Sequence, residues 1–176
     1  MKSMKRIISS ILILGACLSF VTVPLMVQPS WAQSQEDAQS QELLKLIEQA
    51  DQQQKQEKYP QAIETWQQIL AIAQQLKNKQ LQGVALNAVG LNYYLSSGPQ
   101  QALKYFNQAL PIAREVGDRS EEADILDSIG SVYQSMGQPQ EALKYYNQAL
   151  SIARQIGDRK LEATILENIK EVNNSK

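Results

Sequence analysis

The sequence repeats itself with a period of forty residues. Residues 90–118 correspond position by position to residues 130–158, and most residues of the segment 99–119 recur unchanged at 139–159. A period of this length is typical of solenoid proteins, in which a single repeat cannot bury its apolar side and must stack on its neighbours. The repeat therefore predicts a row of similar units.

Each unit has the pattern of two helices joined by a short turn. Small and apolar residues recur at three- and four-residue spacing in two runs, and a break rich in Gly and Pro separates the runs. Pro99 and Pro139 suit the first turn of a helix, while Gly117 and Gly157 suit a left-handed cap at its end. We expect seven helices, near residues 42–57, 60–76, 80–96, 99–116, 119–136, 139–156 and 159–173.

Small and aromatic residues stand at the same places in two of the units. Gly90, Tyr93, Ala102, Phe106 and Ala109 correspond to Gly130, Tyr133, Ala142, Tyr146 and Ala149. This pattern resembles the tetratricopeptide repeat (TPR), and more narrowly its roughly 40-residue form with a Gly-Asp-Arg turn between repeats, here at 117–119 and 157–159. The resemblance implies an all-α, right-handed solenoid over residues 42–176. We expect its hairpins near residues 43–79, 80–118 and 119–158, followed by a capping helix at 159–173.

Three residues depart from the repeat. Gln53 stands where the other units have tyrosine, so the first unit is the least regular. Lys170 occupies the position of Gly90 and Gly130, where a second helix would press on the backbone, and we therefore expect it to face solvent on a terminal helix. Pro111 lies inside an expected helix and removes one hydrogen bond, which predicts a kink without a break.

The first thirty-two residues have the layout of a secretory signal peptide. Basic residues precede an apolar stretch at residues 7–23, and the small residues Ser30 and Ala32 suit cleavage after position 32. We therefore expect an exported protein of the periplasm or an equivalent lumen.

Two alternatives keep the chain on a membrane. The residues around Cys17 resemble a lipobox, which predicts lipidation there, and residues 7–27 approach the length of an uncleaved membrane anchor. The following polar stretch, residues 33–41, predicts a disordered spacer or, alternatively, the first turn of the next helix.

Composition excludes several classes of function. The chain has no histidine, the usual general base near neutral pH, and its single cysteine is Cys17. Cleavage would therefore also leave no thiol nucleophile. No glycine-rich phosphate loop, HExxH or EF-hand spacing is present. Removal of residues 1–32 takes away three of the 17 Lys and Arg and leaves 14 against 18 Asp and Glu, a net charge of −4 that does not suit nucleic acid. We predict a non-enzymatic protein without cofactor or metal.

The resemblance implies that the first helix of each pair lines a concave groove for partners. By spacing, the candidate binding residues are Val84, Asn87, Leu91, Tyr94, Asp124, Asp127, Ser131, Glu167 and Glu171. None is Lys or Arg, so the family's carboxylate clamp is not supported, and only Asn87 matches its residue types. The change from apolar to acidic predicts a protein or peptide partner with apolar and basic residues. Alternatively, the carboxylates are a solvated face.

These patterns favour an interaction module that acts as an accessory or assembly factor. Two alternatives remain: a structural component that associates with copies of itself, and a TPR sensor segment of a larger signalling or protease system. The partner and the process are not encoded in any motif of the sequence.

Overall fold

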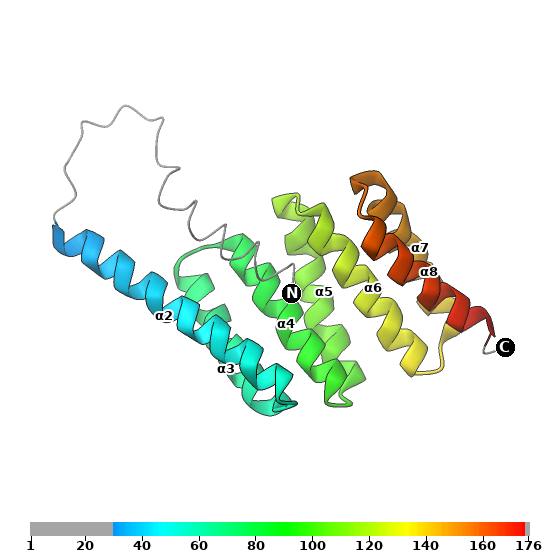
Figure 1. Cartoon of the computed structure of the whole chain (residues 1–176), viewed down its shortest axis with the longest axis horizontal. Coiled ribbons are helices and arrows are strands. Elements are labelled where there is room, and N and C mark those ends of the chain that lie inside the picture. The colour runs from blue at the N-terminus through cyan, green and yellow to red at the C-terminus, as the bar shows by residue number, and fades with distance from the viewer. Residues whose placement is uncertain (1–29, 175–176) are drawn as a thin grey trace.

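The computed structural model describes residues 30–174, with side chains from residue 40 onward. Within that range the chain forms helices joined by short turns, and Figure 1 shows them side by side in a row from α2 at one end to α8 at the other. The helices are α2 (Ser30–Lys55), α3 (Tyr59–Gln75), α4 (Lys79–Leu95), α5 (Pro99–Val116), α6 (Arg119–Ser135), α7 (Pro139–Ile156) and α8 (Arg159–Asn174). The expected all-α solenoid of three hairpins and a final helix is confirmed.

The expected helix boundaries agree with the structure except at the start of α2. Both ends of α5 and α7 lie at the expected residues. By contrast, α2 begins at Ser30, so residues 33–41 are helical. This agrees with the alternative that they start the next helix, and not with a disordered spacer. Neither glycine nor proline interrupts this stretch. Of the expected signal peptide, residues 1–29, with Cys17, lie outside the described residues.

Side chains and glycines define the ends of the helices. Asn78 and Asp118 cap α4 and α6, since each side chain accepts a hydrogen bond at 3.0 Å from a backbone N–H of the first turn. Such a cap contributes about 1 kcal/mol. Gly117 and Gly157 follow α5 and α7 with φ of 72° and 70°, the left-handed conformation that glycine adopts without strain. The turns expected at these glycines are confirmed.

Two glycines allow the helices of a hairpin to approach closely. A Cβ atom added to Gly130 would lie 2.6 Å from the ring of Tyr146, and one added to Gly90 would lie 2.8 Å from the ring of Phe106. At the equivalent position of α8, the side chain of Lys170 is 67% exposed and forms an ion pair with Glu167 at 3.7 Å. Lys170 therefore faces solvent, as expected of a terminal helix.

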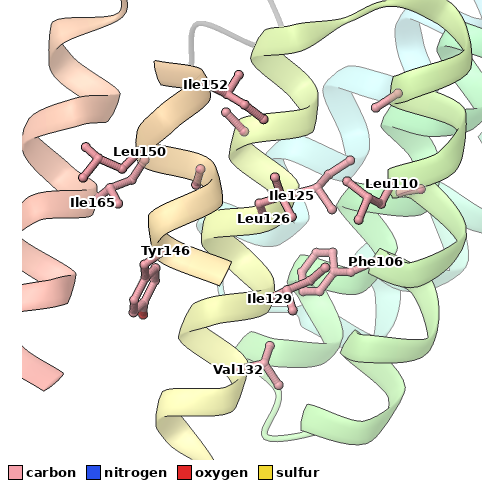
Figure 2. Close-up of a cluster of buried hydrophobic side chains, with 14 of the residues drawn as sticks. Phe106, Leu110, Ile125, Leu126, Ile129, Val132, Tyr146, Leu150, Ile152 and Ile165 are labelled. Carbon is pink, nitrogen blue, oxygen red and sulfur yellow. The ribbon is translucent and has the colours of Figure 1, made fainter. Parts of the chain in front are cut away.

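The buried side chains form a core that continues from one hairpin to the next. Figure 2 shows residues of α5, α6, α7 and α8 meeting in this core, among them Phe106, Ile129 and Tyr146, each with no exposed surface. A second cluster fills the space between α2, α3 and α4 around Ile47 and Ile69. Because each cluster takes side chains from adjacent hairpins, neighbouring repeats stabilise one another.

Aromatic rings add to the contact inside two of the hairpins. Tyr93 of α4 stacks on Tyr105 of α5, and Tyr133 of α6 stacks on Tyr145 of α7, in both cases with ring centroids 5.4 Å apart. Helix α5 continues through the exposed Pro111 as one element, so the expected absence of a break is confirmed.

Candidate functional site

The nine candidate binding residues lie on three helices that are neighbours in space. Helix α4 contacts α6, and α6 contacts α8, so the three present one continuous surface. Seven of the nine side chains are half-buried, and the two glutamates of α8 are exposed. We call this surface the first-helix face; it comprises Val84, Asn87, Leu91, Tyr94, Asp124, Asp127, Ser131, Glu167 and Glu171.

Two hydrogen bonds join neighbouring helices at this face. The Nδ2 group of Asn87 on α4 donates to Oε1 of Glu121 on α6 at 2.8 Å, and Nδ2 of Asn168 on α8 donates to Oδ1 of Asp127 on α6 at 2.9 Å. The amide of Asn87, the one candidate clamp residue, is therefore engaged within the chain. Asn168 and Glu121 were not among the expected site residues.

The hydroxyl of Tyr146 reaches the first-helix face from beneath. It donates to Oε1 of Gln134 at 2.7 Å and lies 3.2 Å from Oγ of Ser131. Burial raises the pKa of Tyr146 to about 12, and the nearby charges of Asp127, Tyr94 and Glu171 act in the same direction, while the hydrogen bond with Ser131 lowers it. Residues of α6 thus contact this hydroxyl group, and charges on α4 and α8 act on its pKa.

The sequence did not show that this hydroxyl belongs to the site. The repeat pattern identified Tyr146 only as the counterpart of Phe106. A signal was nevertheless present, because Ser131 and Gln134 replace Leu91 and Tyr94 in the same repeat that replaces phenylalanine with tyrosine.

Asp127 is a half-buried carboxylate that has no ion pair with any side chain described by the structure. Burial raises its pKa above the ordinary 3.8, and the hydrogen bond from Asn168 opposes that shift. Among residues 40–174, no Lys or Arg forms an ion pair with it. A charged carboxylate in this position lowers the stability of the folded chain, since it loses hydration without gaining a counter-charge.

A separate depression of about 630 Å³ opens between α3 and α5, in the layer of second helices. Its walls include Tyr105, Pro111, Gln74 and Gln82. The positions of Gln74 and Gln82 are occupied by Arg114 and Glu122 one repeat later. The sequence pattern did not indicate this depression, and its lining includes no residue of the first-helix face.

The part of the chain that the structure describes contains no helix with both the length and the apolar character needed to cross a bilayer. The membrane attachment considered for Cys17 and residues 7–27 falls on residues outside that part and stays a prediction.

Comparison with known proteins agrees with the repeat pattern. A family model described as the tetratricopeptide repeat matches residues 42–115 and 121–174, more than half of the chain. No curated protein matches the sequence.

Three solved structures are similar to the fold. BtubC (BKLC) from P. vanneervenii is 20% identical with a TM-score of 0.64, over 72% of this chain and 52% of that one. The TPR domain of Arabidopsis FLU is 19% identical with a TM-score of 0.60, over 66% and 98%. A Podosopora anserina protein with nearly identical TPR-like repeats is 17% identical with a TM-score of 0.64, over 74% and 65%. This chain thus spans about half the length of BtubC, and identities this low show a common fold alone.

Proposed function

Because this chain belongs to the tetratricopeptide repeat family, we propose that it is a non-enzymatic interaction module that binds a segment of a partner protein on the first-helix face. TPR domains bind protein partners, and TPR proteins are generally non-enzymatic scaffolds. In this proposal, the family's concave groove is formed by the layer of first helices, of which α4, α6 and α8 carry the first-helix face.

The change in chemistry along this face is the observation that supports the proposal. Helix α4 contributes the half-buried apolar groups of Val84, Leu91 and Tyr94, whereas α6 and α8 contribute carboxylates. None of the nine side chains is basic. A segment with an apolar side chain followed by basic residues is complementary to this surface, because opposite charges favour its encounter and orientation.

Asp127 supports a basic partner on energetic grounds. Its half-buried charge has a hydrogen bond but, among the side chains that the structure describes, no paired cation, and a lysine or arginine from a partner would supply that charge. A polar group that lowers stability is typical of a functional position rather than a structural one.

Capture of partners with matched variants tests the proposal. Leu91→Ala combined with Tyr94→Ala, and separately Asp124→Lys combined with Asp127→Lys, should each abolish capture at low salt. Gln108→Ala combined with Gln148→Ala, on the exposed side of α5 and α7, should leave it unchanged. Capture that survives both face variants contradicts the proposal.

We further propose that the module acts outside the cytoplasm as an accessory or assembly factor. The layout of residues 1–32 supports export. Mass spectrometry of the protein from its own cells should find an N-terminus at Gln33. A lipidated Cys17 would support the membrane-anchored alternative, and an intact Met1 would contradict cleavage.

Self-association is a second candidate function, and one observation favours it. Leu166 on α8 is 42% exposed, whereas Leu126, its counterpart on α6, is 1% exposed within the core cluster. Light scattering coupled to size-exclusion chromatography decides between the two. A dimer that Leu166→Glu converts to a monomer supports self-association, and a monomer at all concentrations contradicts it.

A further inference from the structure

In the third repeat, three side chains from α6 and α7 meet at the first-helix face, and all three differ from their counterparts in the second repeat. The second repeat has Leu91 and Tyr94 on α4 and Phe106 on α5, and the first two pack against the core cluster that contains the third. Forty residues later, the third repeat has Ser131, Gln134 and Tyr146. We call these the apolar set and the polar set.

Within the polar set, one hydrogen bond joins Tyr146 to Gln134, and Ser131 is bonded to its own helix. A phenol has one proton, and the shorter contact of Tyr146, 2.7 Å to Oε1 of Gln134, takes it. Oγ of Ser131 donates to the backbone carbonyl of Asp127 at 3.1 Å and so stays on its own helix. With its carbonyl held by Tyr146, Gln134 has its amide N–H groups left to donate. The carboxylate of Asp127 is an acceptor on the same face of α6.

The apolar set has no such group beneath it. The ring of Phe106 is fully buried against Gly90, and it has no hydroxyl to orient a side chain above it. Leu91 and Tyr94 are half-buried and pack on the same core. Since phenylalanine fills this position in the second repeat, stacking of the repeats does not require the hydroxyl of Tyr146.

We infer that α4 and α6 provide adjacent subsites of opposite chemistry, and that Tyr146 is the positioning residue that makes the second one polar. This inference rests on the proposed function. The partner segment then has an apolar side chain over Leu91 and Tyr94, and an amide or hydroxyl side chain over Ser131 and Gln134. Its basic residues follow toward Glu171.

Geometry gives the spacing of these side chains. Axes of packed helices lie about 8–10 Å apart, and an extended chain advances about 3.3–3.6 Å per residue. An extended segment that crosses from α4 to α6 therefore places its apolar and polar side chains roughly three residues apart.

Selection from a random 16-residue peptide display library tests this inference. The library is selected on the wild-type protein and on a triple variant, Ser131→Leu, Gln134→Tyr and Tyr146→Phe, which copies the apolar set. Each introduced residue already occurs at the equivalent position one repeat earlier, so the fold should tolerate it; circular dichroism and the melting temperature verify this. Tyr146→Phe alone is the second variant if the triple one does not fold.

We expect peptides selected on the wild type to pair an apolar and a polar residue about three positions apart, and peptides selected on the triple variant to have apolar residues at both. In a peptide selected on the wild-type protein, replacing the polar residue by leucine should weaken binding about tenfold. The Tyr146→Phe protein should show a smaller difference in affinity between the two peptides. In the wild type, bound peptide should also shift the NMR signals of the Gln134 side-chain amide.

The outcomes separate the inference from the proposed function. The same peptide pattern on both proteins, with binding lost in Leu91→Ala and Tyr94→Ala, overturns the two subsites but retains the binding face. Peptides that bind equally to that alanine variant, or a selection that yields no binder to the wild type, contradict the proposed function and the inference with it.

Discussion

The hydroxyl of Thr65 on α3 donates a hydrogen bond to Oε1 of Gln53 on α2 at 2.8 Å. These residues occupy the positions at which the next two repeats stack Tyr93 on Tyr105 and Tyr133 on Tyr145. The first repeat therefore replaces one pairwise contact by another, and the departure at Gln53 has a compensating partner twelve residues away.

A double-mutant cycle at this pair should show favourable coupling. Gln53→Tyr or Thr65→Tyr alone leaves a tyrosine without its stacking partner and removes the hydrogen bond, while the double variant restores the stack of the other repeats. We expect a coupling energy of about 0.5–1.5 kcal/mol from urea unfolding of the four proteins. Additive effects would mean that the two positions do not interact.

Gly130→Ala should destabilise the protein although alanine is the better helix former. The new Cβ would lie 2.6 Å from the fully buried ring of Tyr146, which has no room to move. We expect a loss of about 1–3 kcal/mol in the free energy of unfolding. Ser128→Ala on the same helix is the control and should change little, since the hydroxyl of Ser128 bonds only its own helix. An unchanged or more stable Gly130→Ala protein contradicts the close approach.

Asp127→Asn should stabilise the protein at neutral pH while weakening partner binding. The pKa of Asp127 is raised in the folded state, so the folded chain binds this proton more tightly than the unfolded chain does. The stability of the protein therefore falls as the pH rises from 3.8 through the folded pKa. The asparagine side chain of the variant does not ionise, so the variant does not lose stability in this way. Its amide oxygen can still accept the hydrogen bond from Asn168. Its advantage in melting temperature should be present at pH 7 and shrink toward pH 4. A variant less stable than the wild type at pH 7 would show that Asp127 is structural.

Glu122→Gln should destabilise the protein more than Glu162→Gln at the equivalent position. The side chain of Glu122 is 5% exposed and pairs with both Arg114 and Arg119, whereas that of Glu162 is 30% exposed and pairs with Arg154. Because the arginines are about half exposed, we expect losses of about 1–3 kcal/mol for Glu122→Gln and under about 1 kcal/mol for Glu162→Gln. Chemical denaturation measures both, and equal losses contradict the role of burial.

The ends of α5 and α7 could be predicted because their determinants are local. Proline in the first turn and a left-handed glycine after the last one restrict the backbone whatever surrounds them. The start of α2 could not be predicted in this way. Residues 33–41 contain Gln, Ser, Glu, Asp and Ala, with more than one residue of a type that can cap a helix and no helix breaker, and this composition is compatible with a helix or with a disordered chain.

The contacts across the first-helix face could not be predicted from the sequence for a different reason. A forty-residue period shows which residues are equivalent, but not how neighbouring repeats are rotated against each other. Asn87 therefore meets Glu121, 34 residues away, while Asp127 meets Asn168 at a separation of 41. The period likewise identified Tyr146 as the counterpart of Phe106 but gave no direction for its hydroxyl.

Site-specific photo-cross-linking in the cells that make the protein tests the central claim most directly. A photoreactive residue is placed at Val84 or Glu171 on the first-helix face, or at Gln108 or Gln148 on the exposed side of α5 and α7. The account predicts a cross-linked partner from Val84 and Glu171, lost on Asp127→Lys, and none from Gln108 or Gln148. A partner cross-linked only from Gln108 or Gln148 would contradict it.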